Sequence, residues 1–180
     1  TFRITNPAKI ISYLEEKKNE IEASKEIIEN ELPQIMEKFK SKKSEMHAEV
    51  FRGLEGIKAV FEDSLNYPIT YWLGGGRFLP KMYPDWFFAW TKKRAKMKVK
   101  WVYLMRNELR PDYKPFPYET VKFLPPEFSG SPTFTGIWGD KVVQFVLGEE
   151  LFVFSIESKE LAENYKKYHK YLWDNVAKNP

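Results

Sequence analysis

The first forty residues carry apolar side chains in a heptad pattern. From Ile11, alternate steps of three and four residues reach Ile11, Leu14, Lys18, Ile21, Lys25, Ile28, Leu32, Ile35 and Phe39. A repeat of 3.5 residues is typical of helices that pack against one another in a coiled coil. The pattern predicts a helical arm over residues 1–44. Its helix is expected to begin at Asn6-Pro7 and to be kinked or broken near Leu32 by Pro33.

Two interpretations of this arm remain open. In one, its apolar seam forms a homodimer interface made of Ile11, Leu14, Ile21, Ile28, Leu32 and Ile35. In the other, the same face packs on the chain's own domain, or the helix is only a linker. The persistence of the repeat over about four heptads favours dimerisation, although two lysines on the seam would weaken a symmetric core.

From residue 45 onward, strand-like runs alternate with helical patterns. Strands are expected at 46–51, 69–73, 99–105, 121–124, 133–138, 141–147 and 151–156, and helices at 53–65, 84–96 and 158–176. The early strand–helix order is typical of a parallel sheet, whereas Gly139-Asp140 and Gly148-Glu149-Glu150 predict later antiparallel hairpins. The expected fold class is therefore α/β with a mixed sheet, in a domain over residues 45–180 that follows the helical arm.

Composition narrows the classes of function. The 180 residues include no cysteine and two histidines, which excludes thiol catalysis and Cys-ligated clusters and leaves no expectation of a metal or cofactor. No apolar run reaches the roughly 18 residues of a membrane span, and no signal-like segment is present. We therefore expect a cytoplasmic protein without a membrane partner. Because the chain begins at Thr1, we also expect it to be cut from a longer protein.

Positive charge is concentrated in the middle of the chain. Residues 77–122 carry twelve basic and four acidic side chains, whereas the net charge of the whole chain is +4. Within this stretch, a basic run without an acidic residue consists of Lys92, Lys93, Arg94, Lys96, Lys98 and Lys100, of which Lys92, Lys93, Arg94 and Lys96 are the candidate DNA contacts. This run would either contact DNA phosphates or form a solvated helix end.

Arginines and glycines at expected strand ends define a candidate anion site. Its members are Arg52, Gly74, Gly75, Gly76, Arg77 and Arg106. If the strands are parallel, the three arginines lie at one sheet edge and would bind a small anionic effector or a nucleotide phosphate. Alternatively, the glycines form a sharp turn with positive φ and the arginines make separate ion pairs. The spacing matches neither a P-loop nor a dinucleotide fingerprint.

Four parts of the sequence resemble the TrmB family of archaeal transcriptional regulators. They are FRGLEGIKAVFED at 51–63, WTKKR at 90–94, LPPEFS at 124–129 with IWGDKV at 137–142, and IESKELA at 156–162 followed by Tyr165, Tyr168, Leu172 and Trp173. The resemblance covers residues 2–175 approximately, and it depends on the order and spacing of all four parts.

The resemblance implies a phospholipase D-like domain behind a coiled-coil linker. In this family a winged-helix DNA-binding domain precedes the linker, and sugar-responsive members add a C-terminal sugar-binding domain. The 180 residues contain neither, so DNA would be contacted mainly through a winged helix outside this chain, and a maltose-type effector is not implied. Shorter members are similar in plan, and some bind DNA broadly, like chromatin proteins.

The implied function is the dimerisation and regulatory region of a nucleoid-associated transcription regulator without catalytic activity. Two alternatives stay open: an anion or nucleotide sensor domain, and a part of a chromatin-like protein that binds DNA broadly. A small anionic effector is compatible with all three.

A phosphodiesterase is the competing hypothesis from another class of function, the enzymes, because phospholipase D chemistry occurs on the same fold. That chemistry needs a nucleophilic histidine in an H-x-K-x4-D frame. Here His47 is followed two positions later by Glu49, and His169 by Tyr171. We therefore expect no catalytic residues and no phosphodiesterase activity.

Overall fold

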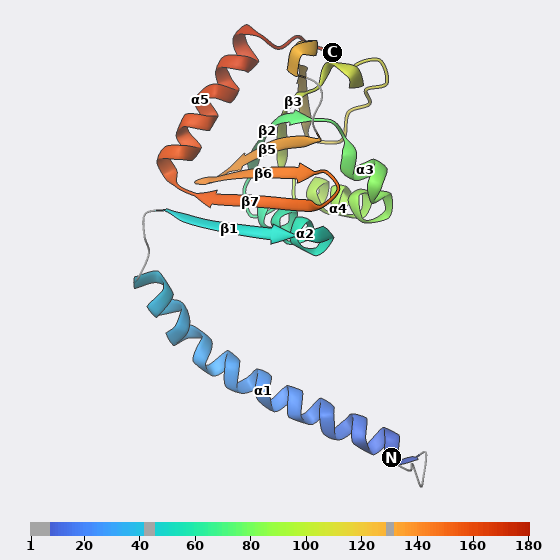
Figure 1. Ribbon diagram of the computed structural model, residues 1–180, viewed down its shortest axis with the longest axis vertical. Helices are drawn as coiled ribbons and strands as arrows, with labels where there is room; N and C mark the ends of the chain where they lie inside the picture. Colours follow the sequence, from blue (N-terminus) through green and yellow to red (C-terminus); the bar gives the residue numbers. More distant parts are fainter. Residues whose placement is uncertain (1–7, 42–45, 129–131) are drawn as a thin grey trace. The chain divides into compact units, whose positions relative to one another are not determined.

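The computed structural model describes residues 8–41, 46–128 and 132–180 (Figure 1). They belong to two units, helix α1 (Ala8–Ser41) and an α/β domain that begins at strand β1 (His47–Arg52). The expected helix start at Asn6-Pro7 and the expected domain boundary after residue 44 lie outside the described residues.

Helix α1 is a single helix of 34 residues that continues through Pro33. The expected break near Leu32 is therefore wrong. A proline removes one backbone hydrogen bond and disturbs one turn, and here the helix continues on both sides of it to Ser41. None of the described helices, α1 included, is long and apolar enough to cross a membrane.

A seven-stranded mixed sheet forms the centre of the α/β domain. Its other strands are β2 (Ile69–Gly75), β3 (Lys100–Met105), β4 (Glu119–Phe123), β5 (Thr133–Trp138), β6 (Lys141–Leu147) and β7 (Leu151–Glu157). The strand order is β1-β7-β6-β5-β2-β3-β4. Strands β2, β3 and β4 are parallel neighbours, and all other neighbouring pairs are antiparallel. The expected fold class, an α/β domain with a mixed sheet after a long helix, is confirmed.

Strand β1 lies at the edge of the sheet and not beside β2. It pairs antiparallel with β7, so that Val50 is opposite Phe154. Helix α2 (Gly53–Ser64), which follows β1, packs against β7. Three strands, β7, β6 and β5, therefore lie between β1 and β2, and β1 is not part of the parallel section that the early strand–helix order predicted.

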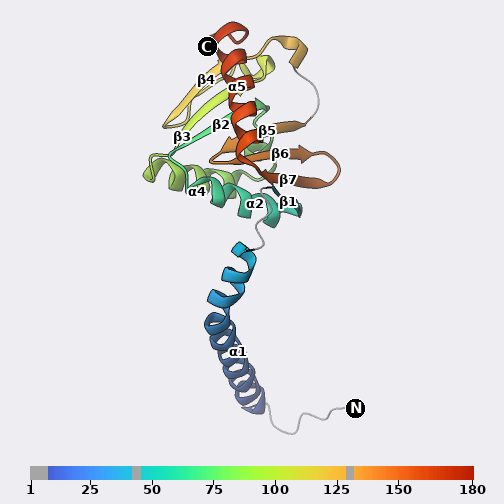
Figure 2. The ribbon, with the colours of Figure 1, turned by 90° about the vertical axis from the view of Figure 1, so that its left-hand side faces the viewer.

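Helices cover both faces of the sheet (Figures 1 and 2). Helices α2 and α4 (Pro84–Lys96) cover one face, and α5 (Lys159–Asn175) covers part of the other. Adjacent side chains of β2 point to opposite faces of the sheet: Trp72 packs with α2 and α4, whereas Tyr71 packs with α5. A short helix that the sequence did not predict, α3 (Phe78–Met82), precedes α4.

Aromatic rings fill the face under α2 and α4. The buried Trp72 ring has six aromatic neighbours with centroids within 6.1 Å: Phe61, Trp101, Tyr103, Phe134, Trp138 and Phe145. Trp90, Trp101 and Trp138 are also buried. These tryptophans therefore form core, and they are not a platform on which bases or sugars could stack.

Candidate functional sites

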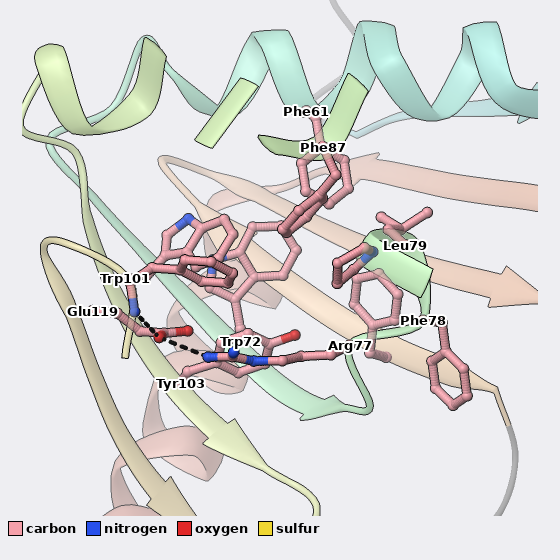
Figure 3. A pocket seen from close by; sticks show the side chains of 12 residues that line it. Phe61, Trp72, Arg77, Phe78, Leu79, Phe87, Trp101, Tyr103 and Glu119 are labelled. Carbon is pink, nitrogen blue, oxygen red and sulfur yellow. Dashed lines mark hydrogen bonds and ion pairs between the residues drawn. The ribbon is translucent and has the colours of Figure 1, made fainter. Parts of the chain in front are cut away.

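A buried ion pair lies beyond the carboxyl end of β2 (Figure 3). Arg77 adopts a left-handed backbone conformation with φ 50°, and its side chain reaches Glu119 at the start of β4. The Arg77 Nη2 to Glu119 Oε2 distance is 3.0 Å. The same oxygen accepts a hydrogen bond from the Phe116 backbone N–H at 2.9 Å, and the guanidinium stacks on the Phe116 ring.

The charges of Arg77 and Glu119 are balanced by groups of the domain itself. The Glu119 side chain is fully buried, and burial raises the pKa of its carboxyl, opposed by the Phe116 N–H and by the charges of Arg77 and Arg94. Burial, together with the Glu119 charge, raises the pKa of Tyr113, whose ring lies beside Arg77. Arg77 is thus already neutralised by a carboxylate, which leaves it a weak candidate for binding a further anion.

The space around Arg77 has two parts. An aromatic cavity walled by Trp72, Trp101 and Tyr103 encloses only about 20 Å³, which is room for about one water molecule. A second cleft of about 410 Å³ shares Arg77 and Phe116 with it, and its charged lining includes Glu108 and Asp112 as well as Lys81. The cleft therefore carries both signs of charge, and it is not a cationic pocket.

Arg106 connects β2 with β5. Its Nε donates to the Gly74 carbonyl at 2.9 Å, and its Nη2 donates to the Thr133 carbonyl at 3.3 Å. It also pairs with Glu108 and stacks on Phe78. Because its side chain is buried and these groups surround it, Arg106 holds strand ends together.

Arg52 does not join the other two arginines. It ends the edge strand β1, four strand positions from β2, which is about 19 Å at the usual strand spacing. Its guanidinium stacks on Phe152 of the neighbouring strand β7. The expected shared anion site of Arg52, Arg77 and Arg106 is therefore not formed.

The glycine run lies at the end of β2, where Gly74 and Gly75 are the last two residues of the strand and the pairing with β3 shifts register between Leu73 and Gly75. Gly74 has φ +78°, a conformation that favours glycine. A Cβ on Gly75 would lie 1.8 Å from the Tyr103 hydroxyl, and one on Gly76 would lie 2.4 Å from the Phe78 ring. Gly75 and Gly76 thus admit aromatic rings against the backbone. The positive φ of Gly74 agrees with one part of the alternative, whereas the sharp turn is not formed, because Gly74 and Gly75 lie within β2.

The basic run divides into two kinds of residue. Arg94 is fully buried, donates to the carbonyls of Val99 and Pro117 at 2.7 and 2.6 Å, and stacks on Trp101. Burial lowers its pKa to about 10. Arg94 is therefore not a DNA contact, because its charge faces the interior. Lys92 and Lys96 are exposed, and Lys93 pairs with Glu62.

The apolar seam of α1 is exposed to solvent. The exposed fractions of its six apolar members, Ile11, Leu14, Ile21, Ile28, Leu32 and Ile35, lie between 46% and 68%. The two seam lysines pair within the helix, Lys18 with Glu22 at 3.7 Å and Lys25 with Glu29 at 3.5 Å. An apolar stripe of this length on one helix face is typical of an association surface.

His169 of α5 is a structural residue. It is buried, its Nε2 lies 3.2 Å from the Trp72 carbonyl, and its ring stacks on Trp173. Burial lowers its pKa to about 4. His47 lies on the edge strand β1, near Glu49. Among the described residues, no three His, Asp or Glu side chains are grouped closely enough to hold a metal ion.

Glu119 and the interior role of Arg94 and His169 were not predicted from the sequence. Arg94 follows Phe87 and Trp90 at helical spacing, and His169 follows Ala162 and Tyr165 in the same way. That periodicity is a signal for burial that could have identified both. No comparable signal marks Glu119, because its partner Arg77 lies 42 positions away.

Solved structures to which this chain is similar include NucT, Nuc and TrmBL2. NucT from Helicobacter pylori is 10% identical, with a TM-score of 0.51 over 74% of this chain and 99% of its own. Nuc from Salmonella typhimurium, a phospholipase D family member, is 12% identical, with a TM-score of 0.46 over 75% and 99%. TrmBL2, an archaeal chromatin protein described with a novel mode of DNA binding, is 16% identical, with a TM-score of 0.49 over 94% and 67%.

At this identity the likeness to NucT shows the fold alone, and the phospholipase D-like α/β fold is the one expected from the sequence. No protein-family model matches the chain. No curated protein sequence matches it significantly.

Proposed function

We propose that this chain is the dimerisation and regulatory region of a TrmB-like, DNA-associated transcription regulator, without catalytic activity. Residues 1–44 serve as the dimerisation arm, and residues 45–180 serve as the regulatory domain. The observation that carries the proposal is the exposed heptad seam of α1. The family resemblance of the four sequence segments adds the expectation of a DNA-bound context.

Burial of the exposed apolar side chains of the seam would drive association of α1. Helices in water are only marginally stable without tertiary contacts, and α1 exposes six large apolar side chains along one line. Burying each such side chain fully is worth about 1.5–3 kcal/mol relative to exposure. A second copy of the same helix offers a matching apolar line, so a homodimer is the association that the seam supports best.

The absence of catalysis is supported by the two histidines. Neither begins an H-x-K-x4-D frame. His169 is buried against Trp72 and Trp173, and its lowered pKa keeps the imidazole neutral near pH 7. A nucleophile must reach its substrate, and His169 is nearly inaccessible.

DNA contact through this chain is secondary in the proposal. The exposed lysines Lys92 and Lys96 lie on α4 and suit nonspecific phosphate contact, while a winged-helix domain would supply the main contacts in a nucleoid-associated protein. An anionic effector, the alternative function, is less well supported because Arg77 and Arg106 already have partners.

Sedimentation equilibrium tests the proposal. The wild-type chain is expected to be a dimer, and Leu14→Asp, Ile21→Asp, Ile28→Asp together should give a folded monomer. The matched control is Asn19→Asp, Ala23→Asp, Asn30→Asp, which adds three charges to the outer face of the same helix and should leave the dimer intact. A wild-type monomer, or a seam variant that remains dimeric, would reject the dimerisation role.

A phosphodiesterase assay tests the second part. With bis(p-nitrophenyl) phosphate as substrate, the chain should release no nitrophenol above the level of a His47→Gln, His169→Gln variant. Turnover that this variant abolishes would show a catalytic protein.

A further inference from the structure

The positions of the two seam lysines of α1 determine which direction and register of a helix pair are favourable. In heptad terms, Ile11, Lys18, Lys25 and Leu32 occupy the a positions, and Leu14, Ile21, Ile28 and Ile35 occupy the d positions. Lys18 and Lys25 are therefore in the core line of any coiled coil that uses this seam. Their surroundings in the partner helix depend on its direction.

A parallel pair places like charges together. In a parallel, in-register coiled coil each core residue faces its own counterpart, so Lys18 would face Lys18 and Lys25 would face Lys25. The position that flanks Lys18 from the second copy is then Lys17. Like-charge juxtaposition in an interface core is costly, and here it would occur in two of the eight layers.

An antiparallel pair removes this conflict. In that arrangement a residues face d residues, and one register uses all eight seam positions of 11–35. Its layers are Ile11 with Ile35, Leu14 with Leu32, Lys18 with Ile28, and Ile21 with Lys25, each occurring twice. No layer contains two lysines, and the aliphatic stem of each lysine packs on an isoleucine while its ammonium reaches the rim.

The flanking acids complete the arrangement. Glu22 and Glu29 occupy the e positions and pair with Lys18 and Lys25 within α1. In an antiparallel pair the e position of one helix lies beside the a position of the other. Lys18 therefore meets Glu29 of the second copy, and Lys25 meets Glu22. The parallel alternative gains only exposed pairs such as Lys17 with Glu22, which contribute little.

We infer that α1 forms an antiparallel two-stranded coiled coil with a second copy of this chain, in the register that places Ile11 opposite Ile35. The inference rests on the proposed dimerisation. It adds the direction and the register of the pairing, which follow from the placement of two lysines and two glutamates on one seam.

Cysteine cross-linking tests the direction. The chain has no cysteine, so Ile11→Cys and Ile35→Cys each introduce a single thiol on an exposed seam position. The two variants, one carrying a size tag, are mixed and treated with a short bis-maleimide. A link between Cys at 11 and Cys at 35 is expected, and links between two thiols at 11 are not, because these lie about 36 Å apart along the helix. Ala23→Cys, on the outer face, is the control and should give no link.

Each other outcome is decisive. Homodimeric links at 11 and at 35 in a dimer of the expected mass would overturn the antiparallel direction and leave the proposed dimerisation standing. A dimer that gives neither kind of link would overturn the register. A monomer by sedimentation would overturn the proposed function itself.

Discussion

Two amphipathic helices of this chain differ in the burial of their apolar faces. Helix α5 is capped by Ser158, whose hydroxyl accepts a hydrogen bond from the Leu161 N–H, and the helix buries Ala162 and His169 against the sheet. Helix α1 exposes every described side chain from Lys9 to Met36. The apolar face of α5 is thus used within the domain, whereas that of α1 is available for association. The contrast agrees with the proposal that the arm serves self-association, whereas the α/β domain has a core of its own.

Removing the central ring of the domain should have the largest effect. Trp72→Ala is expected to lower the free energy of unfolding by about 3–5 kcal/mol, because it leaves a cavity among six aromatic rings. Ile28→Ala in α1 should change the free energy of unfolding of the domain by less than about 0.5 kcal/mol, because Ile28 is not part of the domain's core and its expected effect is on the dimer. Denaturant unfolding followed by tryptophan fluorescence measures both. Equal effects would contradict the division between domain and arm.

Acid should weaken the docking of α5 against the sheet. The pKa of His169 is about 4 in the folded chain against 6.5 for a free imidazole. The unfolded chain therefore binds the extra proton between these values, and stability falls as the pH drops from 6.5 to 4, by about 3 kcal/mol. Urea unfolding at several pH values should show this loss in wild type.

His169→Gln should remove that part of the pH dependence, and His47→Gln on the edge strand should retain it. A wild-type profile that His169→Gln does not flatten would mean that other groups dominate the acid transition. Helix α1 contains no histidine between Ala8 and Ser41, so its association should not follow this profile.

The basic run of α4 offers a comparison within one helix. Arg94→Met should lower the free energy of unfolding by about 2 kcal/mol, because the carbonyls of Val99 and Pro117 lose buried donors. Lys92→Met, on the exposed face, should be neutral for stability within about 0.5 kcal/mol. Thermal unfolding distinguishes them, and a destabilising Lys92→Met with a neutral Arg94→Met would reverse the assignment.

A glycine pair gives the smallest expected difference. Gly75→Ala would bring its Cβ to 1.8 Å from the Tyr103 hydroxyl, whereas a Cβ on Gly148 meets nothing within 4 Å. The first substitution should cost about 1–2 kcal/mol through overpacking, and the second should be close to neutral. Differential scanning calorimetry would detect the contrast, and two equal melting temperatures would argue against the close packing at the end of β2.

Local patterns were sufficient for the strands and long helices of the domain. The alternation in 141–147 and 151–156 and the turn residues between them predicted the β6–β7 hairpin to within one residue. The position of β1 was not predictable in this way, because its partner β7 lies about 100 residues later in the chain. Strand pairing over that distance depends on the whole topology.

The chemistry of the site residues was the least predictable part. The sequence does not distinguish an arginine that faces solvent from one that binds a carbonyl. Arg94 was expected to contact DNA phosphates or to lie at a solvated helix end, and it instead donates to backbone oxygens. For Arg106 the alternative of a separate ion pair holds, with Glu108, and it also donates to backbone oxygens. Arg77 follows three glycines, a context that suggested phosphate binding, and its partner is Glu119. The roles of these three arginines depend on their burial. Of the three, only Arg94 lies at helical spacing from apolar residues, so that its burial was predictable from the sequence.

Hydrogen exchange at two protein concentrations tests the central claim most directly. The account predicts that the backbone amides of α1 become more protected as the protein is concentrated, because the seam is buried only by a second copy. The amides of β2 and β6 should be equally protected at both concentrations. Protection of α1 that is strong and independent of concentration would contradict the account, since the arm would then be stabilised within a single chain.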